Sequence, residues 1–291
     1  MSTDGNRGHP QSGSVFGRLV SNGSAVAAAV VLLLIVVACA AAPLVARFSP
    51  ISQPDIIAGS QPPSFLHPFG TDSASRDILS RVLYGGRVSL AVALIATLVS
   101  VTFGTAYGAI AGFAGGKIES VMMRLLDALL SIPRLLLLIA IFAAWRDLDL
   151  FRLEIIVGLT GWYSLSRMVR GQVLATKTQD YVISARALGA GRARILLRHI
   201  LPNVLSPVIV AATLGVGHVI LLEAGLSYLG VGVAPPQPSW GNIIQDGTEQ
   251  IRQLWWISFF PGLAIVMTVM AFNVLGEALR SAIDPRQTVP R

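Results

Sequence analysis

Six apolar segments, each about as long as a membrane-spanning helix, occupy much of this 291-residue sequence. A helix rises about 1.5 Å per residue, so roughly 20 apolar residues cross a hydrocarbon core of about 30 Å. Inside lipid the backbone must satisfy its own hydrogen bonds, which favours helices. We therefore expect an all-α polytopic membrane protein with six transmembrane helices, at Ser24–Ala46, Ser89–Gly112, Met122–Ala144, Leu153–Val169, Val204–Glu223 and Trp256–Leu275.

The charged residues are distributed unevenly between the two sides of these segments. If the N-terminus is cytoplasmic, that side carries fourteen basic and six acidic residues, and the opposite side carries seven basic and nine acidic residues. This asymmetry follows the positive-inside rule, so the net charge of +7 reflects topology and no nucleic-acid partner is expected. The predicted cytoplasmic segments are 1–20, 170–203 and 281–291, and the predicted extracytoplasmic loops are 47–88 and 224–255.

The first apolar segment allows two interpretations. Arg18, an apolar run and then Cys39 resemble a lipoprotein signal peptide with its cleavage-site cysteine. Apolar character continues beyond Cys39 to Ala46, which gives the length of a full span and favours a retained helix. The residues before this segment, 1–17, are polar and rich in Gly and Ser, and they predict a disordered tail.

Neither extracytoplasmic loop predicts a separate domain. The first loop begins with a proline-rich stretch and then shows an amphipathic pattern typical of a short helix at Asp77–Tyr84. The second follows Glu223, contains three prolines within 235–238, and is bordered by tryptophans suited to the membrane interface.

Common catalytic motifs are absent from the sequence. It contains no GxxxxGK[ST], HExxH, CxxC or GxSxG pattern, and its four histidines are scattered although a metal site needs several converging donors. An intramembrane enzyme would require a nucleophile–base or metal constellation. A secondary transporter would show broken helices and inverted repeats, and no repeat is visible. We expect a non-catalytic chain that binds no cofactor or metal.

The segment "DYVISARALGAGRARILLRHILPNV", Asp180–Val204, interrupts the apolar pattern with four arginines and a Gly-Ala-Gly sequence. Tyr181, Ala185 and Leu188 lie on one stripe of a short helix. Gly189 follows at the position of a helix C-cap glycine. A second short helix is predicted for Arg192–Ile200, with Pro202 in the first turn of the next helix. This pattern indicates a compact helix–turn–helix with small residues on one face.

The same segment resembles the cytoplasmic coupling loop of ABC-importer permeases, whose pattern is Glu-Ala-Ala, three residues, Gly, nine residues, Ile-x-Leu-Pro. Ala185, Gly189, Leu201 and Pro202 match this pattern at the required spacing. The sequence departs from it at three positions, with Ile183 for Glu, Ser184 for Ala and His199 for Ile. Any ion pair that the Glu makes with the ATPase in relatives is therefore absent here.

Two further stretches narrow the resemblance. His67–Leu90, "HPFGTDSASRDILSRVLYGGRVSL", is similar to the stretch after the first helix of the C-type permeases of oligopeptide and dipeptide importers (OppC/DppC type), although relatives usually have Gly in place of Ser75. Gly225–Asn242, "GLSYLGVGVAPPQPSWGN", resembles the last external loop of the same subfamily. The similarity extends from about residue 66 to the C-terminus.

The resemblance implies one permease subunit of an ATP-driven peptide importer in the cell membrane, with a type I ABC-importer transmembrane domain at 87–280. Its implied partners are a homologous permease, two ATP-binding subunits that hold ATP and Mg²⁺, an extracytoplasmic binding protein and a peptide substrate. The same loops occur in nickel importers, which remains an alternative. The residues implied to dock the ATPase are Tyr181, Ala185, Arg186, Gly189, Ala190, Leu201 and Pro202.

Charged and small residues within the apolar segments give weaker signals. Arg124 and Asp127 are spaced for a mutual ion pair on one helix. Arg134 lies deeper, after a kink expected at Pro133, and two roles remain open for it, one in the translocation path and one in a buried structural pair. Glycines at every fourth position of the second segment, Gly104, Gly108 and Gly112, predict close helix packing.

Overall fold

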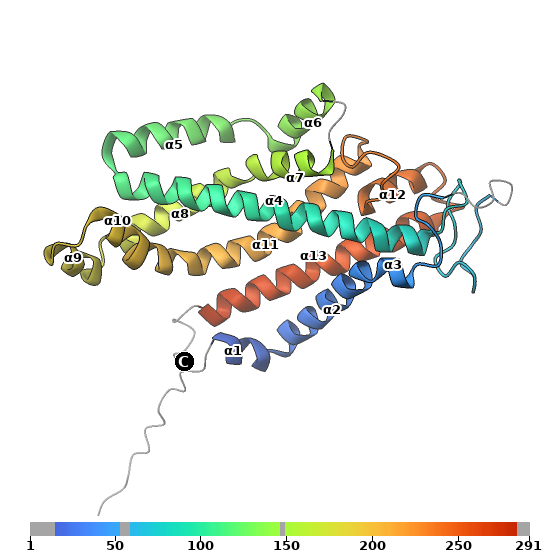
Figure 1. Cartoon of the computed structure of the whole chain (residues 1–291), viewed down its shortest axis with the longest axis horizontal. Helices are drawn as coiled ribbons and strands as arrows, with labels where there is room; N and C mark the ends of the chain where they lie inside the picture. The colour runs from blue at the N-terminus through green and yellow to red at the C-terminus, as the bar shows by residue number, and fades with distance from the viewer. Residues whose placement is uncertain (1–14, 53–58, 146–148, 284–291) are drawn as a thin grey trace, which may run out of the picture.

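The computed structural model describes residues 15–52, 59–145 and 149–283, which form helices and no β-strand beyond one isolated bridge. The predicted all-α fold class is confirmed. The longest helices lie along one axis, with α9 (Asp180–Ala187) and α10 (Arg192–Arg194) at one end and α12 (Trp240–Thr248) at the other (Figure 1). We refer to these as the α9 end and the α12 end.

Four of the described helical segments are long and apolar enough to cross a membrane alone: α2 (Gly23–Ala40), α4 (Ile78–Ala114), Arg192–Tyr228, which ends with α11 (Leu201–Tyr228), and α13 (Trp255–Ile283). Most of the predicted 281–291 tail, and residues 1–14 of the N-terminal tail, lie outside the described residues. The rest of the N-terminal tail is not disordered, because Val15–Ser21 forms helix α1 and Arg18 donates to the carbonyl of Ala282 at 3.4 Å. The two terminal regions therefore lie side by side.

The third and fourth predicted spans are broken helices. In the third, α5 (Gly116–Leu130) and α6 (Arg134–Ala144) meet at a bend of 74°, as the kink expected at Pro133 predicted. In the fourth, α7 (Leu150–Leu159) ends before Gly161, and α8 (Trp162–Thr176) follows. The described chain has four spans, or five if the bent pair counts as one, so the expectation of six is not reproduced as six continuous helices.

Two element boundaries differ from the sequence prediction. The expected short helix at Asp77–Tyr84 is the start of α4, with Asp77 as its N-cap accepting from the Ser80 amide at 2.8 Å. The chain continues through Gly85 and Gly86 with no proline to end the helix, so one 37-residue helix forms. The external loop expected after Glu223 begins only after Tyr228, because α11 continues through that apolar stretch.

The glycine stripe of α4 packs against α8, as predicted. A Cβ at Gly104 would lie 2.9 Å from the carbonyl oxygen of Trp162, and one at Gly112 would lie 3.0 Å from that of Arg170. Between them, a Cβ at Gly108 would overlap the carbonyl oxygen of Ser166. Four-residue spacing on both helices therefore lets the two backbones approach closely along three turns.

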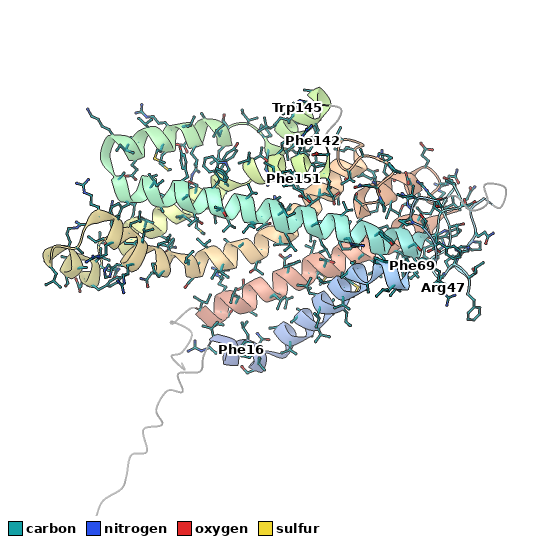
Figure 2. All side chains as sticks on the ribbon, in the orientation of Figure 1. Phe16, Arg47, Phe69, Phe142, Trp145 and Phe151 are labelled. Carbon is teal, nitrogen blue, oxygen red and sulfur yellow. The ribbon has the colours of Figure 1, made fainter. Side chains whose placement is uncertain are left out.

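At the α12 end, buried polar contacts hold the connecting loops onto α4. Arg81 bonds to the carboxylates of Asp72 and Asp246, the latter at 2.8 Å. The fully buried Trp240 of α12 donates its indole N–H to the Val82 carbonyl at 3.0 Å. Phe69 is drawn at this end in Figure 2, where it stacks on Phe260 of α13.

Cys39 packs inside this same core. The cysteine is buried at 4% exposure, and a Cβ at Gly86 of α4 would overlap its sulfur. Helix α2, which contains Cys39, also contacts α13. We interpret this packing as favouring a retained transmembrane helix over a cleaved leader.

Candidate functional site

The loop between α8 and α11 begins with helix α9, which ends in a left-handed glycine. Gly189 has φ +82°, so its predicted C-cap role is confirmed. The amide of Gly189 donates to the Arg186 carbonyl, and the amide of Ala190 donates to the Ala185 carbonyl, both at 3.0 Å. These two bonds form a Schellman motif, which fixes the direction in which the chain leaves the helix.

An apolar cluster anchors α9 to the long helices. Val182 is fully buried and belongs to the same cluster as Val173 of α8, Ile195 and Ile200 after α10, and Val204 of α11. On the outer side, Tyr181 is 45% exposed and Leu188 is 88% exposed. The helix is therefore fixed on one face and presents apolar side chains on the other.

The chain after α10 corrects the prediction of a separate second helix. Residues Ile195–Ile200 form a π-helix, η1, that continues directly into α11 at Leu201. The Leu201 amide bonds to the Leu196 carbonyl, five residues back. Pro202 lies in the first turn of α11, as predicted, and has no N–H to donate. The side chain of Asn203 donates to the His199 carbonyl at 2.7 Å.

The four arginines of this segment are exposed, and none forms a salt bridge within the described part of the chain: Arg186, Arg192, Arg194 and Arg198. They form a cationic rim around the exposed apolar face of α9. Such a surface suits a partner with acidic groups or anionic lipid headgroups.

The two acidic residues of α5 pair with arginines of α8 and not within their own helix. The expected pair of Arg124 with Asp127 is wrong, because Asp127 bonds to Arg167. Glu119 accepts from the Nε of Arg170 at 2.6 Å. Helix packing places these opposite charges closer together than the i,i+3 spacing on one helix does.

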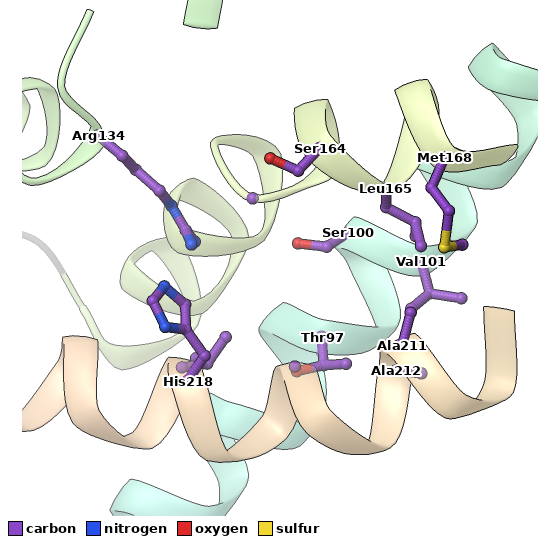
Figure 3. Close-up of a pocket in the computed structure, with 13 residues that line it drawn as sticks. Thr97, Ser100, Val101, Arg134, Ser164, Leu165, Met168, Ala211, Ala212 and His218 are labelled. Carbon is purple, nitrogen blue, oxygen red and sulfur yellow. The ribbon is translucent and has the colours of Figure 1, made fainter. Parts of the chain in front are cut away.

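A cavity of about 280 Å³ lies between α4, α8 and α11, where the two broken spans meet. Thr97 and Ser100 line it near the middle of α4, and Gly215 and His218 line it near the middle of α11. Gly161, in the break between α7 and α8, completes the wall beside Arg134. These positions put the cavity at the depth of the membrane interior. Away from its polar end the lining is largely apolar, with Val101, Leu165, Met168, Ala211, Ala212 and Val219 among the side chains (Figure 3).

Arg134 extends into the polar end of this cavity. It donates to the Val157 carbonyl at 2.7 Å and approaches the Thr160 hydroxyl at 3.4 Å. Val157 and Thr160 lie where α7 ends. The break leaves carbonyl oxygens of the last turn without a helical partner, and Arg134 donates a hydrogen bond to one of them. Gly161 permits this approach, since a Cβ there would lie 2.9 Å from the guanidinium. Among the described residues, Arg134 has no carboxylate partner.

Two polar residues of α11, one buried and one exposed on the cavity wall, escaped the sequence analysis. Glu223 of α11 is 1% exposed and accepts from the Ser89 hydroxyl at 2.8 Å and the Ser227 hydroxyl at 2.7 Å. His218 lies on the cavity wall opposite Arg134. An acidic residue within an apolar segment indicates a buried polar partner, so the sequence could have predicted such a contact for Glu223. His218 carried no comparable signal. No group of three or more His, Cys, Asp or Glu side chains in the described residues is arranged to hold a metal ion.

Comparison with known proteins gives two family matches. A family profile described as the inner membrane component of binding-protein-dependent transport systems matches residues 104–289. A second, described as the N-terminal transmembrane domain of oligopeptide transport permease C, matches residues 11–63.

Individual relatives agree with these profiles. The chain is 40% identical to the oligopeptide transport system permease protein OppC of Bacillus subtilis, over 84% of this chain and 80% of that protein. It is 38% identical to the dipeptide transport system permease protein DppC of the same organism, over 92% and 84%. It is 42% identical to OppC of Haemophilus influenzae, over 76% and 70%.

Proposed function

We propose that this chain, which belongs to the family of inner membrane components of binding-protein-dependent transport systems, is one permease subunit of an ATP-driven peptide importer. The relatives named for oligopeptide and dipeptide transport support a peptide cargo and give no support to nickel. The chain forms half of the translocation pathway. The other half is a homologous permease.

The main support for the mechanism is that packed helices connect α9 to the wall of the cavity. The cluster around Val182 joins α9 to α8, and η1 joins α10 to α11 without a break. Both α8 and α11 line the cavity. A force applied to the exposed face of α9 therefore reaches the cavity through packed helices. Such packing moves between discrete arrangements because a dense core does not deform continuously.

In this proposal the ATPase-docking surface consists of Tyr181, Ala185, Arg186, Gly189, Ala190, Leu201 and Pro202. The Schellman motif holds the first five in one orientation, and the exposed Leu188 beside them adds apolar area. ATP and Mg²⁺ bind to two partner subunits, and this chain performs no hydrolysis. An extracytoplasmic binding protein delivers the peptide.

We further propose that both termini and the α9 end are cytoplasmic. The contact between Arg18 and Ala282 supports placing the two terminal regions on one side. In a Cys39→Ala background, cysteines replacing the exposed Ser64 and Gln237 should react with an impermeant thiol reagent added to intact cells, and a cysteine replacing Thr178 should not. The reverse pattern would overturn this orientation.

A secondary transporter is the second candidate, because α5–α6 and α7–α8 are broken helices of the kind such proteins use. The family match favours the importer. The deciding experiment is copurification followed by uptake of a labelled peptide into proteoliposomes. We expect a homologous, non-identical permease and ATP-binding subunits to copurify, and uptake to require ATP. Transport by this chain alone, without ATP, would refute the proposal.

A further inference from the structure

We propose that the cavity between α4, α8 and α11 is a binding site for the terminal carboxylate of the peptide as it crosses the membrane. This inference rests on the proposed function and adds to it a chemical group of the substrate and the residues that recognise it. The central residues are Arg134, His218 and Thr97.

The polar end of the cavity has an excess of hydrogen-bond donors. Arg134 uses one guanidinium nitrogen on the Val157 carbonyl, while its Nε makes only a 3.4 Å contact with Thr160. A guanidinium has five N–H donors in a planar fork, which suits a carboxylate bound through two oxygens. Figure 3 shows the ring of His218 on α11 facing this guanidinium across the cavity. Its neutral imidazole supplies one more donor.

A second observation points independently to a missing ligand. Thr97 lines the cavity, is 8% exposed, and its hydroxyl has no hydrogen-bond partner among the described residues. A buried hydroxyl without a partner is destabilising, and such groups need an explanation. A carboxylate has four acceptor positions and no donor, so it complements Arg134 and His218. The Thr97 oxygen has almost no accessible surface, so Thr97 joins them only once its side chain rotates toward the cavity.

The charge of the site is also uncompensated. An arginine in the membrane interior is costly and marks a substrate pathway or a buried pair. The buried-pair alternative needs a carboxylate, and the described residues supply none to Arg134. A peptide's terminal carboxylate supplies this charge in every substrate, whatever its sequence.

The size of the cavity favours the end of a peptide over a whole one. Its volume of about 280 Å³ is near the lower limit of ligand pockets, roughly 300 Å³. The lining away from Arg134 and His218 is largely apolar, with Val101, Leu165 and Met168 (Figure 3), and it tolerates side chains of different kinds. The site therefore recognises the terminal group and leaves side chains unspecified.

The test uses the complete importer in proteoliposomes, with the binding protein present at saturating concentration and loaded with a probe peptide. A preliminary titration must show that the binding protein binds both probes. The probes are labelled trialanine and trialanine amide, which lacks the carboxylate. We expect the wild-type importer to take up trialanine faster. Arg134→Gln should lower trialanine uptake about tenfold, the size of one charge-assisted hydrogen bond, and leave amide uptake unchanged.

Three further variants and a third probe sharpen this test. Arg134→Lys keeps the charge and should keep most of the preference. Thr97→Val keeps the shape and should lower the preference about threefold, the size of one neutral hydrogen bond. Arg124→Gln removes an exposed charge from α5 and should change nothing. An amidated tripeptide with a central glutamate should behave like trialanine amide.

Each outcome decides the proposal. If Arg134→Gln lowered the uptake of trialanine and of trialanine amide equally, the arginine would stabilise α7 or pair with a carboxylate of the partner permease. The proposed carboxylate site would then be wrong. Arg134→Gln uptake equal to that of the wild type for both probes would also refute the proposed site. Glutamate-peptide uptake equal to that of trialanine would refute recognition of the terminal group. If the wild-type importer took up no probe, the proposed peptide transport would fail first, and this inference with it.

Discussion

At the α12 end, Arg81 is 3% exposed and bonds to Asp72 and Asp246, whereas at the α9 end four arginines are exposed and form no salt bridge within the described residues. Trp240 is fully buried at the α12 end, and Leu188 is 88% exposed at the α9 end. The arginine network around Asp72 and Asp246 is paired internally, and the arginines of the α9 end are available to a partner.

The comparison shows how one chain combines a stable end with an end that presents its side chains to a partner. Buried, paired charges at the α12 end fix the loops of that end to α4, so this end keeps its shape. The α9 end gains its rigidity from the apolar cluster around Val182 and from the Schellman motif at Gly189, and neither uses the outward-facing side chains. Substitutions at the two ends should therefore affect different properties.

The largest effect on stability is expected for Arg81→Met at the α12 end. Removal of the arginine leaves the buried Asp72 carboxylate with less compensation, which costs about 3–5 kcal/mol when a buried pair is broken. The free energy of unfolding in detergent, followed by denaturant titration, measures this loss. The half-exposed Arg76→Met, which shares both carboxylate partners, should cost about 1 kcal/mol or less. Equal effects would mean that burial does not separate the two arginines.

A smaller loss is expected for Gly108→Ala, between the two ends. The new methyl group would overlap the Ser166 carbonyl oxygen and push α4 away from α8, at an overpacking cost of about 1–3 kcal/mol. Gly262→Ala on α13 is the matched control, because a Cβ there has nothing within 4 Å. It should stabilise the helix by about 0.5–1 kcal/mol. The sign of the change in unfolding temperature tells the two apart.

Gly189→Glu at the α9 end should cost about 1–2 kcal/mol of local strain, since a side chain disfavours positive φ. Its effect on function should be larger than this figure suggests. We expect normal membrane levels, sharply reduced peptide uptake and weaker copurification of the ATPase. Gly191→Ala, at φ −64° with no atom near its Cβ, should retain uptake. Normal uptake by Gly189→Glu would refute the docking assignment of α9.

The smallest effect is expected for Arg192→Ala in the cationic rim. A single exposed charge near a membrane surface contributes about 1 kcal/mol, and this one has no salt bridge to lose. Uptake at matched membrane levels should fall by less than half. A loss as large as that of Gly189→Glu would mean that the rim, and not the shape of the turn, binds the ATPase.

The sequence alone determined features that depend on neighbouring residues. The apolar runs predicted an all-α membrane fold, Pro133 located a kink, and Gly189 located a helix C-cap, because backbone hydrogen bonds connect residues only a few positions apart. The glycine stripe of α4 was readable for the same reason. The boundaries were less accurate, since α4 and α11 extend through stretches that contain no breaker.

Only the tertiary structure decided which distant residues meet. Asp127 pairs with Arg167, forty positions away, and not with Arg124 on its own helix. Arg134, at the start of α6, faces His218 of α11 across the cavity, and Glu223 of α11 accepts a hydrogen bond from Ser89 of α4. These pairings depend on how close whole helices approach and how they are rotated. Both follow from packing over the full length of each helix, and no short window of sequence contains that information.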